Sequence, residues 1–309
     1  MALPQHLQDL AAKVSNWGRW GADDRRGTLN LIDAAAIARG IGAARQGKVF
    51  SLSMPFDEDG PQMGQVPGRE NPAREMIAIN LSLNGNPDDF SSSDDKVAMG
   101  LQCATHWDTL AHVSYSAKLY NNVDATDTDE RGSRSFGIET FGPIVTRGVL
   151  LDVARALGVD YFEDNHPITG DDLDAAVRLA NVTVEPGDIV CVRTGQMHYL
   201  HDGSEKFRFV YPCPGLSTMS VEWLRDHDVA GVATDTLVLE CMPCEDDEVM
   251  LPVHMIQLRD MGLQQGQNWE LDALAADCCG DGQYDFLLTA TPLPFTRALG
   301  GPVAPTAIK

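Results

Sequence analysis

Short apolar runs alternate with helical patterns from about residue 143 to the end of the chain. The runs are of a length and composition typical of buried strands, and they cover residues 149–153, 189–193, 229–234 and 284–290. Segments with apolar residues every three or four positions predict helices over residues 170–180, 217–227, 252–261 and 271–278. We expect Thr169 or Gly170 to start the first of these helices and Ser217 or Ser220 to cap the second. Alternation of strands with helices indicates the α/β class.

The first half of the chain is less regular. Its patterns predict helices over residues 7–14 and 34–45, the second capped by Asp33, and strands over residues 49–54 and 76–83. Residues 55–73 are rich in proline, glycine and polar side chains, so we expect a long loop of the kind that often forms a lid. The tail at 292–305 predicts coil. With no repeat and no clear linker, residues 1–309 are expected to form one domain, of which residues 1–47 are an N-terminal helical extension.

Charge and composition exclude several classes of partner. The chain carries 45 acidic and 23 basic side chains, a formal net charge of −22, so we expect no nucleic-acid partner and no membrane partner. No targeting signal and no apolar run of about 18–20 residues is visible, and the seven cysteines lack the spacing of a disulfide framework. We therefore expect a cytoplasmic protein with reduced thiols. The Cys241-x-x-Cys244 pair is compatible with a zinc site or with ordinary buried thiols.

One short segment concentrates side chains that bind metals, and it reads Gln102-Cys-Ala-Thr-His106-Trp-Asp108-Thr-Leu-Ala-His112. An imidazole and a carboxylate two residues apart, followed by a further imidazole, are typical of a divalent-metal site. In a straight strand His106 and Asp108 share one face, but residues 102 and 106 would lie about 13 Å apart. If Gln102 joins the same site, the segment must therefore bend. The alternative is that these are hydrogen-bonded polar residues near a core.

Motifs for other chemistries are missing from the sequence. There is no phosphate-binding glycine loop, no G-x-S-x-G elbow and no H-E-x-x-H pair. His254 opens an apolar helical segment, and the remaining histidines outside residues 102–112 lie among polar or turn residues. The segment 102–112 is therefore the candidate site.

The same segment resembles the signature H-x-G-T-H-x-D-x-P-x-H of the cyclase family of metal-dependent hydrolases. That family includes bacterial kynurenine formamidase, isatin hydrolase and a trans-dienelactone hydrolase. Further matches follow in the same order along nearly the whole chain, at Trp20–Asp24, Gly27–Asn30, Arg193-Thr194-Gly195, Pro214–Ser217, Thr234-Asp235, His254 and Pro292-Leu293-Pro294. The N-terminal matches resemble the long bacterial subgroup of the family.

This resemblance implies a set of site residues. His106 and Asp108 correspond to metal ligands and His112 to a catalytic acid/base, while His254 and Gln267 complete the metal site. Gln102 stands where a ligand histidine is usual, and it either binds through its amide oxygen or hydrogen-bonds a water on the metal. Gln267 stands where kynurenine formamidases have glutamate. Because a neutral amide there removes negative charge, we expect one divalent ion rather than two, either Mn²⁺ or Zn²⁺.

The resemblance also implies a fold, an activity and an assembly. The expected fold is α/β of the swivelling β/β/α type, with a mixed sheet or barrel-like core surrounded by helices. The expected activity is hydrolysis of an amide, lactam or lactone bond in a small cyclic or aryl substrate by metal-activated water. Trp107, Tyr115 and Tyr120 are predicted to line the substrate pocket, the alternative being packing. The chain is expected to form a homodimer or homotetramer. Two other functions stay open, a non-catalytic small-molecule-binding protein on the same scaffold and a polyketide-type cyclase.

Overall fold

The computed structural model describes residues 3–309. Its α-helices are α1 Gln5–Val14, α2 Ala34–Ala43, α3 Val153–Ala156, α4 Gly170–Ala180, α5 His198–Asp202, α6 Phe207–Val210, α7 Val221–Asp226, α8 Pro252–Met255 and α9 Asp272–Asp281. Its strands are β1 Val49–Ser51, β2 Ala73–Ser82, β3 Ser91–Ala98, β4 His106–Asp108, β5 Thr128–Asp129, β6 Gly132–Ser133, β7 Val145–Asp152, β8 Pro167–Ile168, β9 Ile189–Arg193, β10 Gly215–Leu216, β11 Gly231–Thr234, β12 Gln264–Gln267, β13 Asp285–Thr289, β14 Gly300–Pro302 and β15 Thr306–Ile308. Within residues 3–309, no helix is both long and apolar enough to cross a membrane.

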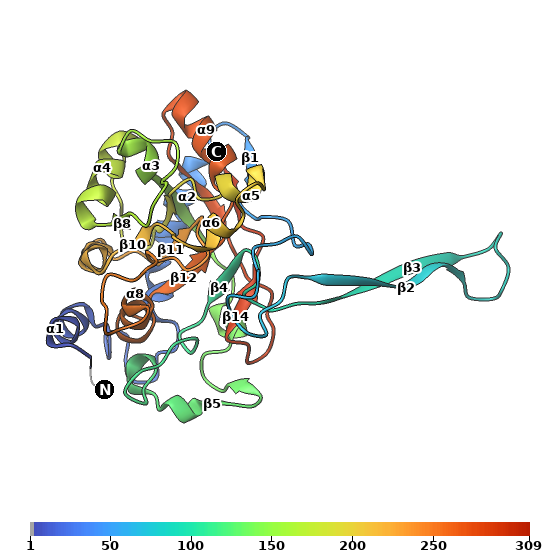
Figure 1. The fold of residues 1–309 in the computed structure, drawn as a ribbon, viewed down its shortest axis with the longest axis horizontal. Helices are drawn as coiled ribbons and strands as arrows, with labels where there is room; N and C mark the ends of the chain where they lie inside the picture. Colours follow the sequence, from blue (N-terminus) through green and yellow to red (C-terminus); the bar gives the residue numbers. More distant parts are fainter. Residues whose placement is uncertain (1–2) are drawn as a thin grey trace.

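A curled nine-stranded sheet organises the molecule, with the order β1-β15-β13-β7-β9-β11-β12-β4-β14. The four strands β7, β9, β11 and β12 run parallel to their neighbours in the centre, and the strands on both sides of them pair antiparallel. Helices surround this half-barrel (Figure 1). The predicted α/β fold with a mixed sheet or barrel-like core surrounded by helices is confirmed.

Both faces of the central strands are buried. Successive residues of β7 and β9 alternate between two apolar clusters, so that Val190 lies in one cluster and Cys191 in the other. The first cluster packs under α1, α4 and α7, and the second packs under α9. Strands that are covered on both faces carry near-continuous apolar runs. The sequence therefore predicts these strands.

Local capping also follows the sequence. Asp33 caps α2 by accepting a hydrogen bond from the backbone N–H of Ala36, at 2.8 Å. Thr169 forms a reciprocal capping box with Asp172 at the start of α4. Both caps satisfy backbone donors that a helix start leaves free.

Several strands depart from the sequence predictions, and β14 and β3 show why. The tail predicted as coil contains β14, in which Gly300 and Gly301 pair with β4. A strand with this sequence has low intrinsic propensity, and its edge position, where proline is tolerated, lets tertiary pairing override that preference. β3 was not predicted at all, because its sequence SSSDDKVA is largely polar.

The hairpin formed by β2 and β3 leaves the body of the molecule. Figure 1 shows it projecting sideways as a long two-stranded ribbon, which we call the arm and define as residues 73–98. The strand predicted at 76–83 is thus present, but most of its side chains face solvent. The predicted loop at 55–73 contains no regular strand or helix before the arm begins.

Candidate metal centre

Strand β4 places the motif in the sheet. It lies between β12 and β14 and is antiparallel to both, with His106 opposite Gln267 on one side and Pro302 on the other. Residues 101–105 form turns and bends before the strand. The bend that a shared site requires is therefore present, and it brings Gln102 back toward the residues that follow the strand.

Two buried acceptor atoms face each other on this strand. The Nδ1–H of His106 donates to the carbonyl of Ala104 at 2.7 Å, which leaves Nε2 with a lone pair. That Nε2 lies 3.6 Å from Oδ1 of Asp108, and both side chains are only 1% exposed. Neither of these two atoms has a hydrogen-bond partner among residues 3–309. Facing buried acceptors repel one another unless a cation or a donor lies between them.

The charge states at physiological pH sharpen this conflict. Burial lowers the pKa of His106 to about 4, so its imidazole is neutral. Burial alone would raise the pKa of Asp108, but the imidazoles of His112, His106 and His254 together hold it below its ordinary value. The carboxylate is therefore an anion, and no cationic side chain within residues 3–309 forms an ion pair with it.

His112 approaches the same carboxylate from the segment after β4. Its Nε2 lies 3.9 Å from Oδ1 of Asp108, and the amide nitrogen of Gln102 lies 3.5 Å from its Nδ1. Burial lowers the pKa of His112. With a side chain that is 22% exposed, His112 is far more accessible than His106.

His254 and Gln267 complete the group. The Nδ1–H of His254 donates to Oε1 of Glu240 at 2.6 Å. The amide nitrogen of Gln267 donates to Oδ2 of Asp108 at 2.7 Å and faces Nε2 of His254 at 3.1 Å. The fold thus joins Gln102, His112, Asp108, His106, Gln267 and His254 in one chain of contacts, although they span more than half of the sequence.

The three aromatic residues predicted to line the pocket lie elsewhere. Trp107 points to the opposite face of β4, where it is fully buried, packs edge-on against Trp269 and donates to the carbonyl of Ala290. Its prediction as a substrate contact is corrected to packing, because side chains alternate along a strand.

The two tyrosines bind carboxylates near the N-terminal helix. The hydroxyl of Tyr115 donates to Asp260, and its ring lies under the guanidinium of Arg259. The hydroxyl of Tyr120 donates to Asp24 at 3.0 Å, and its ring is buried against Phe136. Neither tyrosine has a described contact with His106, Asp108 or His112.

Two residues of the site were missed in the sequence. Glu240 is buried and also accepts hydrogen bonds from the backbone N–H groups of Val253 and His254, so it positions the start of α8. Arg69, from the loop before the arm, acts electrostatically on His106, Asp108 and His112. Its side chain is half-buried and forms no ion pair within residues 3–309. No local pattern marks either residue, because both reach the site only through tertiary structure.

The donor set is chemically suited to a divalent metal ion. His106 and His254 each donate one ring N–H to a fixed acceptor, a backbone carbonyl and a carboxylate respectively. This arrangement fixes each ring and is the usual support of metal-binding histidines. Nε2 of His106 has no hydrogen-bond partner within residues 3–309, and Nε2 of His254 faces the amide nitrogen of Gln267. Together with Asp108 these nitrogens form the mixed imidazole and carboxylate set that such ions prefer.

A second group of imidazole and carboxylate side chains lies at the surface. His201, Glu270 and Asp272 are, within residues 3–309, the group whose three potential ligand atoms all lie within 4.8 Å of one another. Here, however, Nε2 of His201 is 2.8 Å from Glu270, and Asp272 binds Arg193 at 2.7 Å. These ligand atoms already have partners.

Comparisons with known proteins agree with this geometry. The family model described as a putative cyclase matches residues 50–240, which is more than half of the chain. A crystal structure described as a novel cyclase is 34% identical, with a TM-score of 0.88, over 97% of this chain and 99% of that one. No curated protein matches the sequence.

More distant structures share the fold. Isatin hydrolase A from Ralstonia solanacearum is 20% identical with a TM-score of 0.64, covering 89% of this chain and 94% of its own. A predicted metal-dependent hydrolase from Bacillus stearothermophilus is 17% identical with a TM-score of 0.51, covering 84% and 97%. From the family match and the 34% identity over nearly the whole chain, this protein belongs to the cyclase family.

Proposed function

We propose that this protein is a metal-dependent hydrolase that opens an amide, lactam or lactone bond in a small cyclic or aryl substrate, with one Mn²⁺ or Zn²⁺ ion. The observation that carries the proposal is the pair of buried, unpartnered acceptors, Nε2 of His106 and Oδ1 of Asp108, at 3.6 Å. A buried anion without a counter-charge is costly, and a bound cation removes that cost.

His106 and Asp108 would hold the ion, with His254 and the side chains of Gln102 and Gln267 around them. When bound, the ion supplies Lewis acidity, which lowers the pKa of a water molecule and polarises a carbonyl. Gln267 keeps Asp108 in place through its hydrogen bond to Oδ2, so that Oδ1 stays directed at His106. Glu240 does the same for His254.

His112 is the residue placed to move protons. It is the accessible imidazole of the group, and Gln102 contacts its Nδ1, so proton exchange with a substrate takes place at Nε2. Because burial lowers its pKa, the ring is neutral at pH 7 and is competent to take a proton from the attacking water. It then returns the proton to the departing nitrogen or oxygen.

Arg69 brings a positive charge to the site, and no carboxylate within residues 3–309 forms an ion pair with it. Hydrolysis of an amide or a lactone releases a carboxylate, and a guanidinium binds carboxylates well. We infer that Arg69 attracts the carboxylate that forms or an acidic group already present on the substrate. The position of Arg69 on the loop 55–73 would also tie closure of that loop to binding.

The experiment is a screen of the metal-loaded protein against isatin, N-formylkynurenine, small lactams and lactones, repeated with the His112→Ala variant. We expect turnover of at least one class, loss of turnover after chelation, and a fall of about 100-fold or more in kcat for the variant. Metal content measured on the same variant shows that the loss is not a loss of the ion. Unchanged turnover in His112→Ala would contradict the acid/base role.

One observation favours a second candidate, a non-catalytic small-molecule-binding protein. The amide hydrogens of Gln267 already occupy Oδ2 of Asp108 and Nε2 of His254 without any ion. Elemental analysis separates the two candidates, because less than about half an ion per chain after metal loading favours the binding protein. No contact in the described residues favours ring closure of a polyketide type.

A further inference from the structure

One asparagine closes the loop that precedes the arm. The side-chain amide of Asn71 donates hydrogen bonds to three backbone carbonyls of this loop. They belong to Glu58, Gly60 and Gln62, at N···O distances of 3.2, 3.2 and 3.0 Å. Oδ1 of Asn71 accepts a further bond from the backbone N–H of Gln62 at 2.9 Å. We call residues 58–71 the Asn71 loop, and its shape is fixed from within, as in a compact Ω-loop.

Two contacts fix the Asn71 loop to the turn that precedes β4. Gln62 is only 8% exposed, and its side-chain amide donates to the carbonyl of Cys103 at 2.9 Å. At the other end of the loop, the carbonyl of Glu70 accepts the backbone N–H of Gly100 at 3.1 Å. Cys103 directly follows Gln102, so the loop is bound to the same turn that carries a residue of the candidate metal centre.

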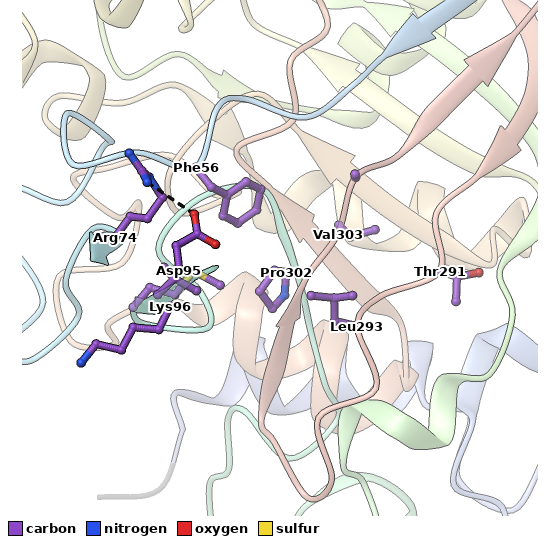
Figure 2. A pocket seen from close by; sticks show the side chains of 11 residues that line it. Phe56, Arg74, Asp95, Lys96, Thr291, Leu293, Pro302 and Val303 are labelled. Atoms are coloured by element: carbon purple, nitrogen blue, oxygen red, sulfur yellow. Dashed lines mark hydrogen bonds and ion pairs between the residues drawn. The ribbon is translucent and has the colours of Figure 1, made fainter. Parts of the chain in front are cut away.

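Apolar packing holds the segment that leads into the Asn71 loop. Phe56 packs against the buried cluster that contains Cys103 and Ala104. Figure 2 shows its ring beside a largely apolar cavity of about 560 Å³, which Pro302 also lines. Pro302 pairs with His106 in the main sheet. The loop is therefore anchored next to the strand that carries the metal-binding motif.

Arg69 lies between these anchors. Its backbone N–H donates to the carbonyl of Val66 at 3.1 Å, which closes a turn. Its side chain crosses Gly100 so closely that a Cβ there would lie 3.1 Å from Cγ of Arg69. The guanidinium is near enough to act electrostatically on Cys103 and Asp108. Because no carboxylate within residues 3–309 forms an ion pair with Arg69, its charge is available to a ligand.

We propose that Asn71 is a positioning residue for Arg69, and that the Asn71 loop holds this guanidinium at the metal centre to select substrates that already carry a carboxylate. This inference deepens the proposed function and rests on it. A free arginine side chain loses much rotamer freedom when it binds a ligand. A loop that fixes its backbone, with Gly100 packed against its stem, reduces that loss, so a carboxylate binds more tightly.

The charges of the molecule favour a substrate that is already an anion. Two carboxylates belong to the site, those of Asp108 and Glu240, and a bound divalent ion would offset both. Arg69 then makes the site positive in a chain whose net charge is −22. A local positive charge of this kind attracts anions that the rest of the surface repels. A neutral lactam or lactone offers this charge no partner until its bond opens, whereas a substrate carboxylate binds it from the first encounter.

The test compares benzoate with benzamide, an uncharged molecule of nearly the same shape. Their affinities for the metal-loaded protein are measured by isothermal titration calorimetry, with the metal content of each sample recorded. We expect native protein to bind benzoate about tenfold or more tighter, because charge-assisted hydrogen bonds to a carboxylate have effects of this size. This preference should fall about tenfold in Arg69→Gln and about fivefold or more in Asn71→Ala.

The double variant Arg69→Gln/Asn71→Ala separates positioning from a purely structural role. If Asn71 acts through Arg69, adding Asn71→Ala to Arg69→Gln should leave the preference unchanged within about twofold. Asn121→Ala is the matched control, because the amide of Asn121 closes another loop through three backbone carbonyls within residues 21–24. It should lower the thermal stability as Asn71→Ala does, but it should keep the native preference for benzoate.

Gln62→Met provides a second variant if Asn71→Ala does not fold, as judged by circular dichroism. It removes the bond to Cys103 and leaves the backbone contacts of Asn71 in place, and it should lower the preference about threefold or more. Three outcomes would each overturn the proposal. They are a native preference in whichever of these variants folds, equal affinity of native protein for the two ligands, and a further loss when Asn71→Ala is added to Arg69→Gln. A preference that depends on Arg69 and Asn71 in a protein without turnover would support the role of Asn71 and contradict the hydrolase activity alone.

Discussion

Two buried charged side chains in this protein, Lys309 and Asp108, differ in whether the fold pairs them with an opposite charge. The ammonium group of Lys309 is fully buried, and it lies 2.7 Å from Asp277 and 2.8 Å from Asp281. The carboxylate of Asp108 is almost as deeply buried, but its Oδ1 faces a neutral imidazole and has no hydrogen-bond partner within residues 3–309. The fold pairs the first charge with two carboxylates, whereas no lysine or arginine within residues 3–309 forms an ion pair with the second.

This difference separates a structural ion network from a candidate functional site. A fold that neutralises its own buried charge gains nothing from a ligand there. A fold that leaves a buried anion unpaired gives up stability locally, and it recovers that stability when a cation binds. The predictions below test this contrast in order of decreasing effect.

The largest effect should come from Asp108→Asn. The variant removes the one anionic side chain directed at His106, so we expect loss of the bound metal and a fall in activity of about 1,000-fold or more. Because an unpaired buried charge is also removed, the metal-free variant should be at least as stable as the metal-free native protein. Metal analysis and thermal unfolding with and without chelator measure both effects. A marked drop in metal-free stability would show that Asp108 is a structural residue.

Lys309→Met should affect stability instead of activity. The substitution leaves Asp277 and Asp281 without their shared buried cation, and we expect a loss of about 2–3 kcal/mol in the free energy of unfolding. Lys48 still contacts Asp277 and limits the loss. Metal content and turnover should stay native, and urea unfolding gives the comparison. If metal content falls together with stability, the two regions are not independent.

The ion pairs of Lys309 with Asp277 and Asp281 should also determine part of the pH dependence of stability. Lys309 lowers the pKa of Asp277 through a hydrogen bond, and Lys48 adds to this effect. Burial opposes ionisation of Asp281, but Lys309 still lowers its pKa. A lowered carboxyl pKa contributes stability that is complete above the unfolded value near pH 4 and is lost as the pH falls through the folded value. The difference between native protein and Lys309→Met should therefore be constant from about pH 5 to 7 and shrink below pH 4.

The smallest effect is expected at the surface group formed by His201, Glu270 and Asp272. His201→Ala removes a side chain that is 54% exposed and already paired with Glu270, so activity should stay within about twofold and stability within about 0.5 kcal/mol. Metal stoichiometry after loading should not change. A loss of one ion per chain in His201→Ala would show that the metal binds at this surface group and not at His106 and Asp108.

Much of the fold was predictable because its signals are local. Residues close together in the sequence determine the apolar runs of β7 and β9 and the helix caps Asp33 and Thr169. The structure confirms these elements. The failures occurred where pairing outweighed propensity, as in β14, whose glycines form a strand only because β4 is beside them. The helix predicted at 252–261 begins as α8 and continues as a π-helical segment from Ile256 to Met261.

The sequence by itself determined the α/β class and the presence of a ligand-rich segment around His106, because periodicity and side-chain type depend on residues close together in the chain. The tertiary structure decided what those ligands face. Strand register places Gln267 beside Asp108, and Gln267 in turn faces His254, which Glu240 holds in place. Trp107 points away from these residues because side chains alternate along β4. Lys309 lies between two carboxylates, whereas no lysine or arginine within residues 3–309 forms an ion pair with Asp108. Whether a buried charge is paired depends on distances between segments far apart in the chain, and no local pattern records those distances.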